Sequence, residues 1–100
     1  MTDRKIIEEL VDAELEAANK DYPLFHSPHE AYGVLLEEVE ELAEAVEVIN
    51  NHMVRMWDMI RQDDSVAHEK EMIHYWATEA ACEAIQICAM AKKITQSDLR

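Results

Sequence analysis

An unbroken heptad pattern of apolar residues in the middle of the chain limits the possible folds more than any other feature. From Tyr32 to Ile60 the spacing alternates between three and four residues, the repeat of a helix that packs lengthwise on another helix. The pattern comprises Tyr32, Leu35, Val39, Leu42, Val46, Ile49, Met53, Met56 and Ile60. One long helix is the simplest interpretation, and it predicts a long helical neighbour.

Start signals just before this pattern place the beginning of the long helix. Ser27 can cap the N-terminus, and Pro28 suits the first helical position. Glu30, three residues after the cap, completes a capping box. The long helix is therefore predicted to run from here to about Arg61.

Two further helices are predicted on either side. Residues 3 to about 20 carry two adjacent apolar stripes and predict an amphipathic first helix. After the long helix, Asp64 or Ser65 can cap a third helix from about 66 to 95. The third helix is predicted to pair antiparallel with the long one, and the first helix to pack across both.

The composition supports an all-α fold in one domain that covers residues 1–100. The chain has a single Gly and two Pro, far fewer than turns and sheets require. The third helix is apolar almost all round between Trp76 and Ala91, so it needs more neighbours than one chain supplies. We expect a homodimer whose two helical hairpins complete a four-helix bundle.

Charge and cysteine usage exclude several classes of partner. A net charge of -13 repels nucleic-acid polymers and anionic membrane surfaces. Cys82 and Cys88 lie six residues apart on one helix and point to different sides, so no intrachain disulfide is expected. The last helix has no apolar run long enough to span a membrane, and no signal peptide is visible. We expect a reducing, cytoplasmic location.

Acidic residues gather beside the apolar pattern on both long helices. Glu38 and Glu41 share one side of the long helix next to the seam. On the third helix Glu79, Glu83 and Gln86 form one stripe with spacing i, i+4, i+7. Such stripes are either solvated faces or ligands of a cation, and the spacing alone leaves both interpretations open.

The antiparallel pairing predicts that the two acidic groups lie at one height. With a turn near residues 63 and 64, residue i lies beside roughly residue 127 minus i. Glu41 is then opposite Gln86, and Glu44 is opposite Glu83. Oxygen ligands that converge from facing helices suit Mg²⁺ or Mn²⁺.

Two segments of the chain resemble the MazG-like all-α nucleoside-triphosphate pyrophosphohydrolases, in particular the small phage and prophage members. The segments are Phe25 to Leu42 and Glu83 to Ala91. Those enzymes carry an E-x-x-E pair on one helix and E-x-x-D on the next, which bind Mg²⁺ and a nucleotide triphosphate. Here the first pair corresponds to Glu38 and Glu41, and the second to Glu83 and Gln86, with Gln in place of Asp.

The resemblance implies hydrolysis of a (deoxy)nucleoside triphosphate to the monophosphate and pyrophosphate. The implied metal ligands are Glu38, Glu41, Glu83 and Gln86, the last a neutral and weaker ligand. Glu37 or Glu79 is a candidate general base. His26 and His29 are candidates for contact with the nucleotide, or ordinary polar residues beside the helix cap.

Other classes of function remain alternatives. Because Gln86 removes a negative charge from the site, the chain is alternatively a helical interaction or assembly module that keeps the fold without the chemistry. Glu71 and His74 form an E-x-x-H element of the kind found in di-iron bundles, but only one copy is present. Trp57 and Trp76 are interpreted as core or interface anchors.

Overall fold

The structure, a computed structural model, describes residues 2–21 and 24–97. These residues form three α-helices: α1 (Arg4–Asp21), α2 (Pro28–Arg61) and α3 (Ala67–Gln96). No strand occurs among the described residues, so the predicted all-α class is confirmed. The predicted helix bounds agree with the observed ones to within about two residues.

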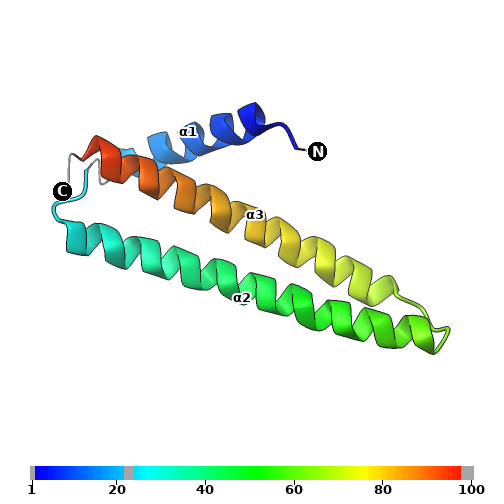
Figure 1. Cartoon of the computed structure of the whole chain (residues 1–100). Coiled ribbons are helices and arrows are strands. Elements are labelled where there is room, and N and C mark those ends of the chain that lie inside the picture. The colour runs from blue at the N-terminus through cyan, green and yellow to red at the C-terminus, as the bar shows by residue number, and fades with distance from the viewer. Residues whose placement is uncertain (1, 22–23, 98–100) are drawn as a thin grey trace.

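The two long helices form an antiparallel hairpin, and α1 lies beside the C-terminal half of α3 (Figure 1). Val11 and Leu15 of α1 pack against Ala89 of α3, whose small side chain allows close approach and is fully buried. Within the described residues, α1 contacts α3 but not α2. The prediction that the first helix packs across both long helices is therefore wrong, because its narrow buried stripe is satisfied by α3 alone.

The ends of α2 explain where this helix starts and stops. Ser27 Oγ accepts a hydrogen bond from the Glu30 backbone N–H at 3.1 Å, and Pro28 follows the cap, as predicted. At the other end Asp63 has a φ of 55°, in the left-handed region. The next N–H, from Asp64, donates to the Met59 carbonyl at 2.8 Å and closes the last turn.

The start of α3 differs from the predicted caps. Val66 occupies the cap position and makes no side-chain cap hydrogen bond. Ser65 lies one residue earlier, and its Oγ accepts from the Ala67 N–H at 3.2 Å. Asp64 Oδ1 accepts from the Ser65 N–H at 2.7 Å. Both polar side chains therefore shape the turn before the helix and do not occupy the cap itself.

The apolar face of α2 is divided into two parallel rows. The inner row faces α3, and all its members are buried or half-buried: Ala31, Leu35, Glu38, Leu42, Ala45, Ile49, His52, Met56 and Met59. The outer row is offset by one residue, and all its members are exposed: Tyr32, Leu36, Val39, Ala43, Val46, Asn50, Met53, Trp57 and Ile60. Each row keeps the alternating four and three spacing of a packing seam.

This division corrects the single seam predicted from the sequence. The predicted pattern alternates between the two rows, because Leu35, Leu42 and Ile49 lie on the inner row whereas Val39 and Val46 lie on the outer row. The helix α3 covers only one flank of a wide apolar face. Half of the predicted seam is therefore exposed to solvent in the single chain.

The single chain is also unusually extended for its length. Its principal extents are 56 × 27 × 21 Å and its Cα radius of gyration is 17.4 Å. A compact domain of this length has a radius of about 13 Å. Its core is correspondingly small, because Val11, Leu15 and Ala89 are the described residues that form its buried apolar cluster.

The remaining expectations concern the cysteines, membrane spans and tryptophans. Cys82 and Cys88 are both free, and both are exposed. No helix among the described residues is long and apolar enough to cross a membrane. Trp57 is exposed on the outer row, so it is not a core residue of the single chain. Trp76 is half-buried and packs edge-on against Tyr75.

Candidate metal centre

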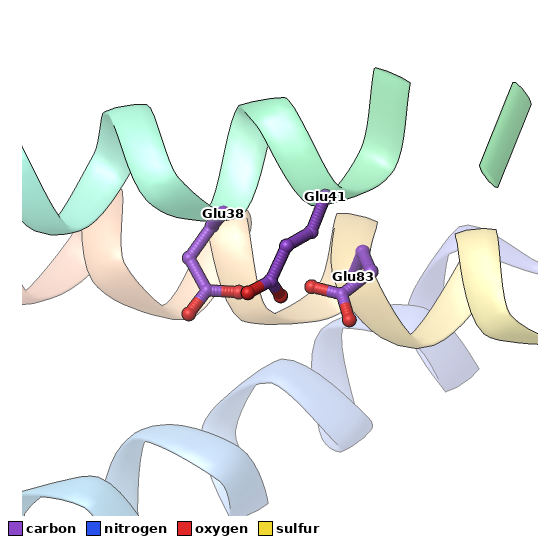
Figure 2. A group of neighbouring side chains, drawn as sticks. All are labelled: Glu38, Glu41 and Glu83. Atoms are coloured by element: carbon purple, nitrogen blue, oxygen red, sulfur yellow. The ribbon is translucent and has the colours of Figure 1, made fainter. Parts of the chain in front are cut away.

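Three glutamates from the two long helices come together on one side of the hairpin. Glu38 and Glu41 extend from α2 toward Glu83 of α3 (Figure 2). One oxygen atom from each carboxylate lies within 4.8 Å of the others. Glu38 and Glu83 are half-buried between the helices, and Glu41 is exposed. We call these three residues the acidic cluster.

The amide of Gln86 joins the acidic cluster as a hydrogen-bond donor. In the amide orientation that satisfies its neighbours, Gln86 Nε2 donates to Glu38 Oε2 at 2.6 Å and to Glu83 Oε2 at 3.2 Å. The residue therefore reaches the predicted site. It contributes N–H groups to the carboxylates, and an amide rotation would be needed to present its oxygen to a cation.

Burial and mutual repulsion raise the pKa values of two members of the cluster. A hydrogen bond with Glu83 raises the pKa of Glu41, and the negative charge of Glu83 adds to the effect. Burial is the largest cause that raises the pKa of Glu83, followed by its hydrogen bond with Glu38. The cluster therefore takes up a proton more readily than free glutamates, which is the behaviour expected of close carboxylates without a cation.

The height at which the helices face each other differs from the predicted register by about one helical turn. Glu41 was expected opposite Gln86, but its carboxylate lies beside that of Glu83. Gln86 instead reaches Glu38. The predicted residues meet nevertheless, since Glu38 and Glu41 are themselves one turn apart.

The donor set fits a hard divalent cation. All three ligands are carboxylate oxygens, which Mg²⁺ and Mn²⁺ favour over Zn²⁺ or copper. Two ligands of one Mg²⁺ ion lie at most about 4.2 Å apart, because the metal–oxygen distance is about 2.1 Å. Oxygens within 4.8 Å of each other need only small side-chain movements to reach that geometry.

The two candidate bases lie beside the cluster on opposite helices. The negative charge of Glu37 contributes to the raised pKa of Glu41. The charge of Glu79 acts in the same way on Glu83. Glu37 is exposed and Glu79 is half-buried. Both candidates are therefore close enough to the acidic cluster to affect its charge.

The two histidines from the predicted site are not part of the cluster. His26 lies before α2, and its Nδ1 is 3.5 Å from Glu30 Oε2. His29 is exposed in the first turn of α2. Glu30 and His29 precede Glu38 by about two helical turns. If a ligand is held at the acidic cluster, these histidines could contact only the end of the ligand that lies farthest from the cluster.

Sequence reasoning missed two other polar groups. His52 Nδ1 pairs with Glu69 Oε2 between α2 and α3, and both side chains are buried. His52 continues the inner row, which was a usable signal for its burial. Lys93 is also buried. It continues the stripe of Glu83 and Gln86 at i+10 and i+7, so its position could have been read from the spacing.

Comparisons of the chain with protein-family models, curated proteins and solved structures find no match. The two distinguishing features of the site are three carboxylates from facing helices and the raised pKa values of Glu41 and Glu83.

Proposed function

We propose that this chain is a metal-dependent pyrophosphohydrolase that converts a (deoxy)nucleoside triphosphate to the monophosphate and pyrophosphate. The observation that carries the proposal is the convergence of Glu38, Glu41 and Glu83. Paired α2 and α3 each supply part of this cluster, so it is an arrangement of the fold and not a solvated run along one helix. The motif resemblance supplies the reaction class.

The proposed chemistry follows from the charges at the site. A chain with a net charge of -13 repels a triphosphate unless cations intervene, and the acidic cluster is where such cations would be held. A bound Mg²⁺ or Mn²⁺ neutralises phosphate oxygens and lowers the pKa of a bound water. Glu38, Glu41 and Glu83 are the proposed ligands. Glu37 or Glu79 is the proposed base for the attacking water.

A direct test combines metal binding with product analysis. Isothermal titration with Mg²⁺ and Mn²⁺ should show binding to the wild-type chain, and Glu83→Gln should remove it. A screen of the common nucleoside and deoxynucleoside triphosphates should then show metal-dependent release of pyrophosphate. Absence of metal binding in the wild type and in Gln86→Asp would disprove the proposed metal centre.

The alternative function, assembly through helical surfaces, is favoured by a specific observation. The outer row of α2 has no cover within the described residues. The helix α3 carries a similar row of small residues. Each member follows, by one residue, a position of α3 that faces α2. The row comprises Ala77, Ala81, Ala84, Cys88 and Ala91. Because the helices are antiparallel, the same offset turns both rows to one face, opposite the acidic cluster.

The large accessible surface of the single chain supports the proposal of a partner. It measures 7528 Å², whereas a folded monomer of 11.6 kDa exposes about 5,800 Å². A standard interface buries about 800 Å² per partner. We infer that the occupant is a second copy of this chain, so that two hairpins form the four-helix bundle expected from the sequence.

The charge distribution along α2 favours an antiparallel arrangement of the two copies. Residues 28–44 contain six glutamates and no Lys or Arg, whereas residues 45–61 have no net charge. Antiparallel pairing separates the two acidic halves. In the register that sets Leu36 opposite the partner's Ile60, heptad geometry also brings Glu40 near the partner's Arg61. Self-association is compatible with the enzyme, since the acidic cluster lies on the other face.

A further inference from the structure

A cavity near the acidic cluster is lined by residues from all three helices. Its volume is about 440 Å³, and its apolar lining includes Phe25, Val34 and Met90. Asp21 and Glu30 also line it, and both are exposed. The remaining polar member is Lys93, which is only 4% exposed. The cavity therefore combines an apolar wall, one ammonium group on a buried side chain and two exposed carboxylates.

Hydrogen bonds join the segment before α2 to the end of α3, so the wall of the cavity that contains Phe25 is held in position. The Phe25 backbone N–H donates to Ser97 Oγ at 2.9 Å. Ser97 Oγ in turn donates to the Lys93 carbonyl at 2.8 Å. Phe25 is itself buried, and its ring centroid lies 4.8 Å from Lys93 Nζ. These contacts hold the aromatic wall and the ammonium group in a fixed relation.

The ammonium group of Lys93 has no carboxylate or carbonyl acceptor among the described residues. Among the described residues it makes no hydrogen bond and no ion pair, and the Phe25 ring is its one recorded partner. A cation–π contact recovers only part of the cost of removing an ammonium group from water. A Lys side chain that is buried along its length and lines a cavity can therefore donate a hydrogen bond to a ligand with an acceptor atom.

The other polar residues distinguish among possible acceptors. A phosphate group in the cavity would lie close to the Asp21 and Glu30 carboxylates and be repelled by them. A neutral heteroaromatic ring fits better, because a carbonyl oxygen can accept from Lys93 while ring N–H groups donate to the carboxylates. The apolar side chains Phe25, Val34 and Met90 suit the faces of such a ring.

The cavity lies where a nucleoside would extend from phosphates bound at the acidic cluster. Val34 of the cavity is one helical turn from Glu38. On α3, Met90 of the cavity is one turn beyond Gln86. Cavity and cluster thus share one face of the hairpin. They are separated by about 6 Å of helix rise, which a sugar and its linked phosphate can span.

We propose that this cavity binds the base of the nucleotide and that Lys93 selects bases with a ring carbonyl next to an N–H, as in guanine, hypoxanthine, uracil and thymine. Adenine and cytosine carry an amino group at that position, and Lys93 can only donate. This inference rests on the proposed function for the choice of a nucleotide as ligand. The base selection itself requires neither metal nor hydrolysis.

Two matched pairs of nucleosides test the selection. Inosine and adenosine, and uridine and cytidine, differ in exchanging a carbonyl and ring N–H for an amino group and ring nitrogen. Binding to the full chain is measured in EDTA by chemical-shift titration, so the acidic cluster holds no cation. The keto member of at least one pair should bind about tenfold tighter than its amino partner or better, because a hydrogen bond to a charged donor is at stake.

Variants at adjacent lysines assign the selection to one side chain. Lys93→Met keeps the length and apolar contacts of the side chain and should abolish the preference. Lys92→Met is the matched control, because Lys92 is half-exposed on another side of α3 and pairs with Asp12. It should leave the preference intact.

The possible outcomes separate this inference from the proposed function. The inference fails if neither keto nucleoside binds, if the members of both pairs bind equally, or if Lys93→Met retains the preference. If Lys93→Met does not fold, the wild-type comparison of the two pairs decides alone. Metal-dependent release of pyrophosphate without base selection would leave the proposed function standing and remove the inference. Selection without hydrolysis would support the inference and remove the proposed activity.

Discussion

In the amide orientation that satisfies its neighbours, Gln86 Nε2 lies 2.6 Å from Glu38 Oε2, which links the acidic stripe of α3 directly to that of α2. This amide supplies donors to carboxylates that otherwise only repel one another. An aspartate at the same position would add a fourth negative charge and remove the donors. The same substitution should therefore lower the stability of the metal-free protein and raise the stability that bound metal adds.

Gln86→Asp tests this relationship. Without metal the variant should melt at a lower temperature than the wild type, because a carboxylate replaces the donor to Glu38 and Glu83. With Mg²⁺ at one hundred times the variant's dissociation constant, the variant should gain about 2.7 kcal/mol of stability. At the same Mg²⁺ concentration the wild type, which binds more weakly, should gain less. Differential scanning fluorimetry with EDTA and with Mg²⁺ measures both effects. Equal Mg²⁺ responses in the two proteins would argue against a cation at the cluster.

The raised pKa values of Glu41 and Glu83 predict a loss of stability toward neutral pH in the metal-free protein. The folded state retains protons that the unfolded state releases above its ordinary pKa of about 4.3, so stability falls as pH rises through the folded pKa. Melting temperatures in EDTA between pH 4 and 8 measure this slope. Glu83→Gln should flatten it, and an unchanged slope would contradict the coupling between the two residues.

The His52–Glu69 pair predicts the opposite dependence at acidic pH. The hydrogen bond from His52 lowers the pKa of Glu69 in the folded protein. This contribution is fully present above the unfolded pKa of about 4.3 and is lost as pH falls through the folded pKa. Glu69→Gln should reduce stability at pH 6 and weaken the acid dependence. Acid titrations of wild type and variant that run parallel would rule out this role for the pair.

The outer row of α2 predicts a dimer that one charge can dissociate. Val46 lies at the middle of the exposed row, so Val46→Glu places a carboxylate at the centre of the proposed interface. Light scattering at micromolar concentration should show a dimer for the wild type and a monomer for the variant. Glu47→Gln, next to it on the helix, is the control and should remain dimeric. A monomeric wild type would refute the proposed self-association.

The turn after α2 predicts a stabilising substitution far from the site. Asp63 has a φ of 55°, a region that Gly adopts without the steric penalty of a side chain. Asp63→Gly should therefore raise the free energy of unfolding. The gain should not exceed about 1 kcal/mol, because Asp tolerates this region better than most residues. Urea denaturation measures the change. Asp64→Gly is the control at the next residue, and it should give no such gain.

Local signals along the chain were enough to predict the three helices. Ser27 and Pro28 act within one turn, so the start of α2 follows from the sequence and is confirmed. The capping box predicted for Glu30 is not among the hydrogen bonds of the described residues, and the Glu30 carboxylate lies 3.5 Å from His26 Nδ1 instead. The scarcity of Gly and Pro likewise predicts the all-α class. The spacing of Glu38 and Glu41 and of Glu83 and Gln86 placed each pair on one side of its helix, and the structure brings the two pairs together.

Only the tertiary structure decided which flank of α2 meets α3. Heptad spacing identifies an apolar face about 100° wide on α2. The spacing does not show which flank of that face the partner helix covers. Leu35 and Leu42 are covered whereas Val39 and Val46 are not, because the closest packing of α3 follows the row that also contains Ala31 and Ala45. The register of Glu41 with Glu83 and the burial of Lys93 depend on the same packing, since contacts between helices are set by side-chain fit and not by the period of either helix alone.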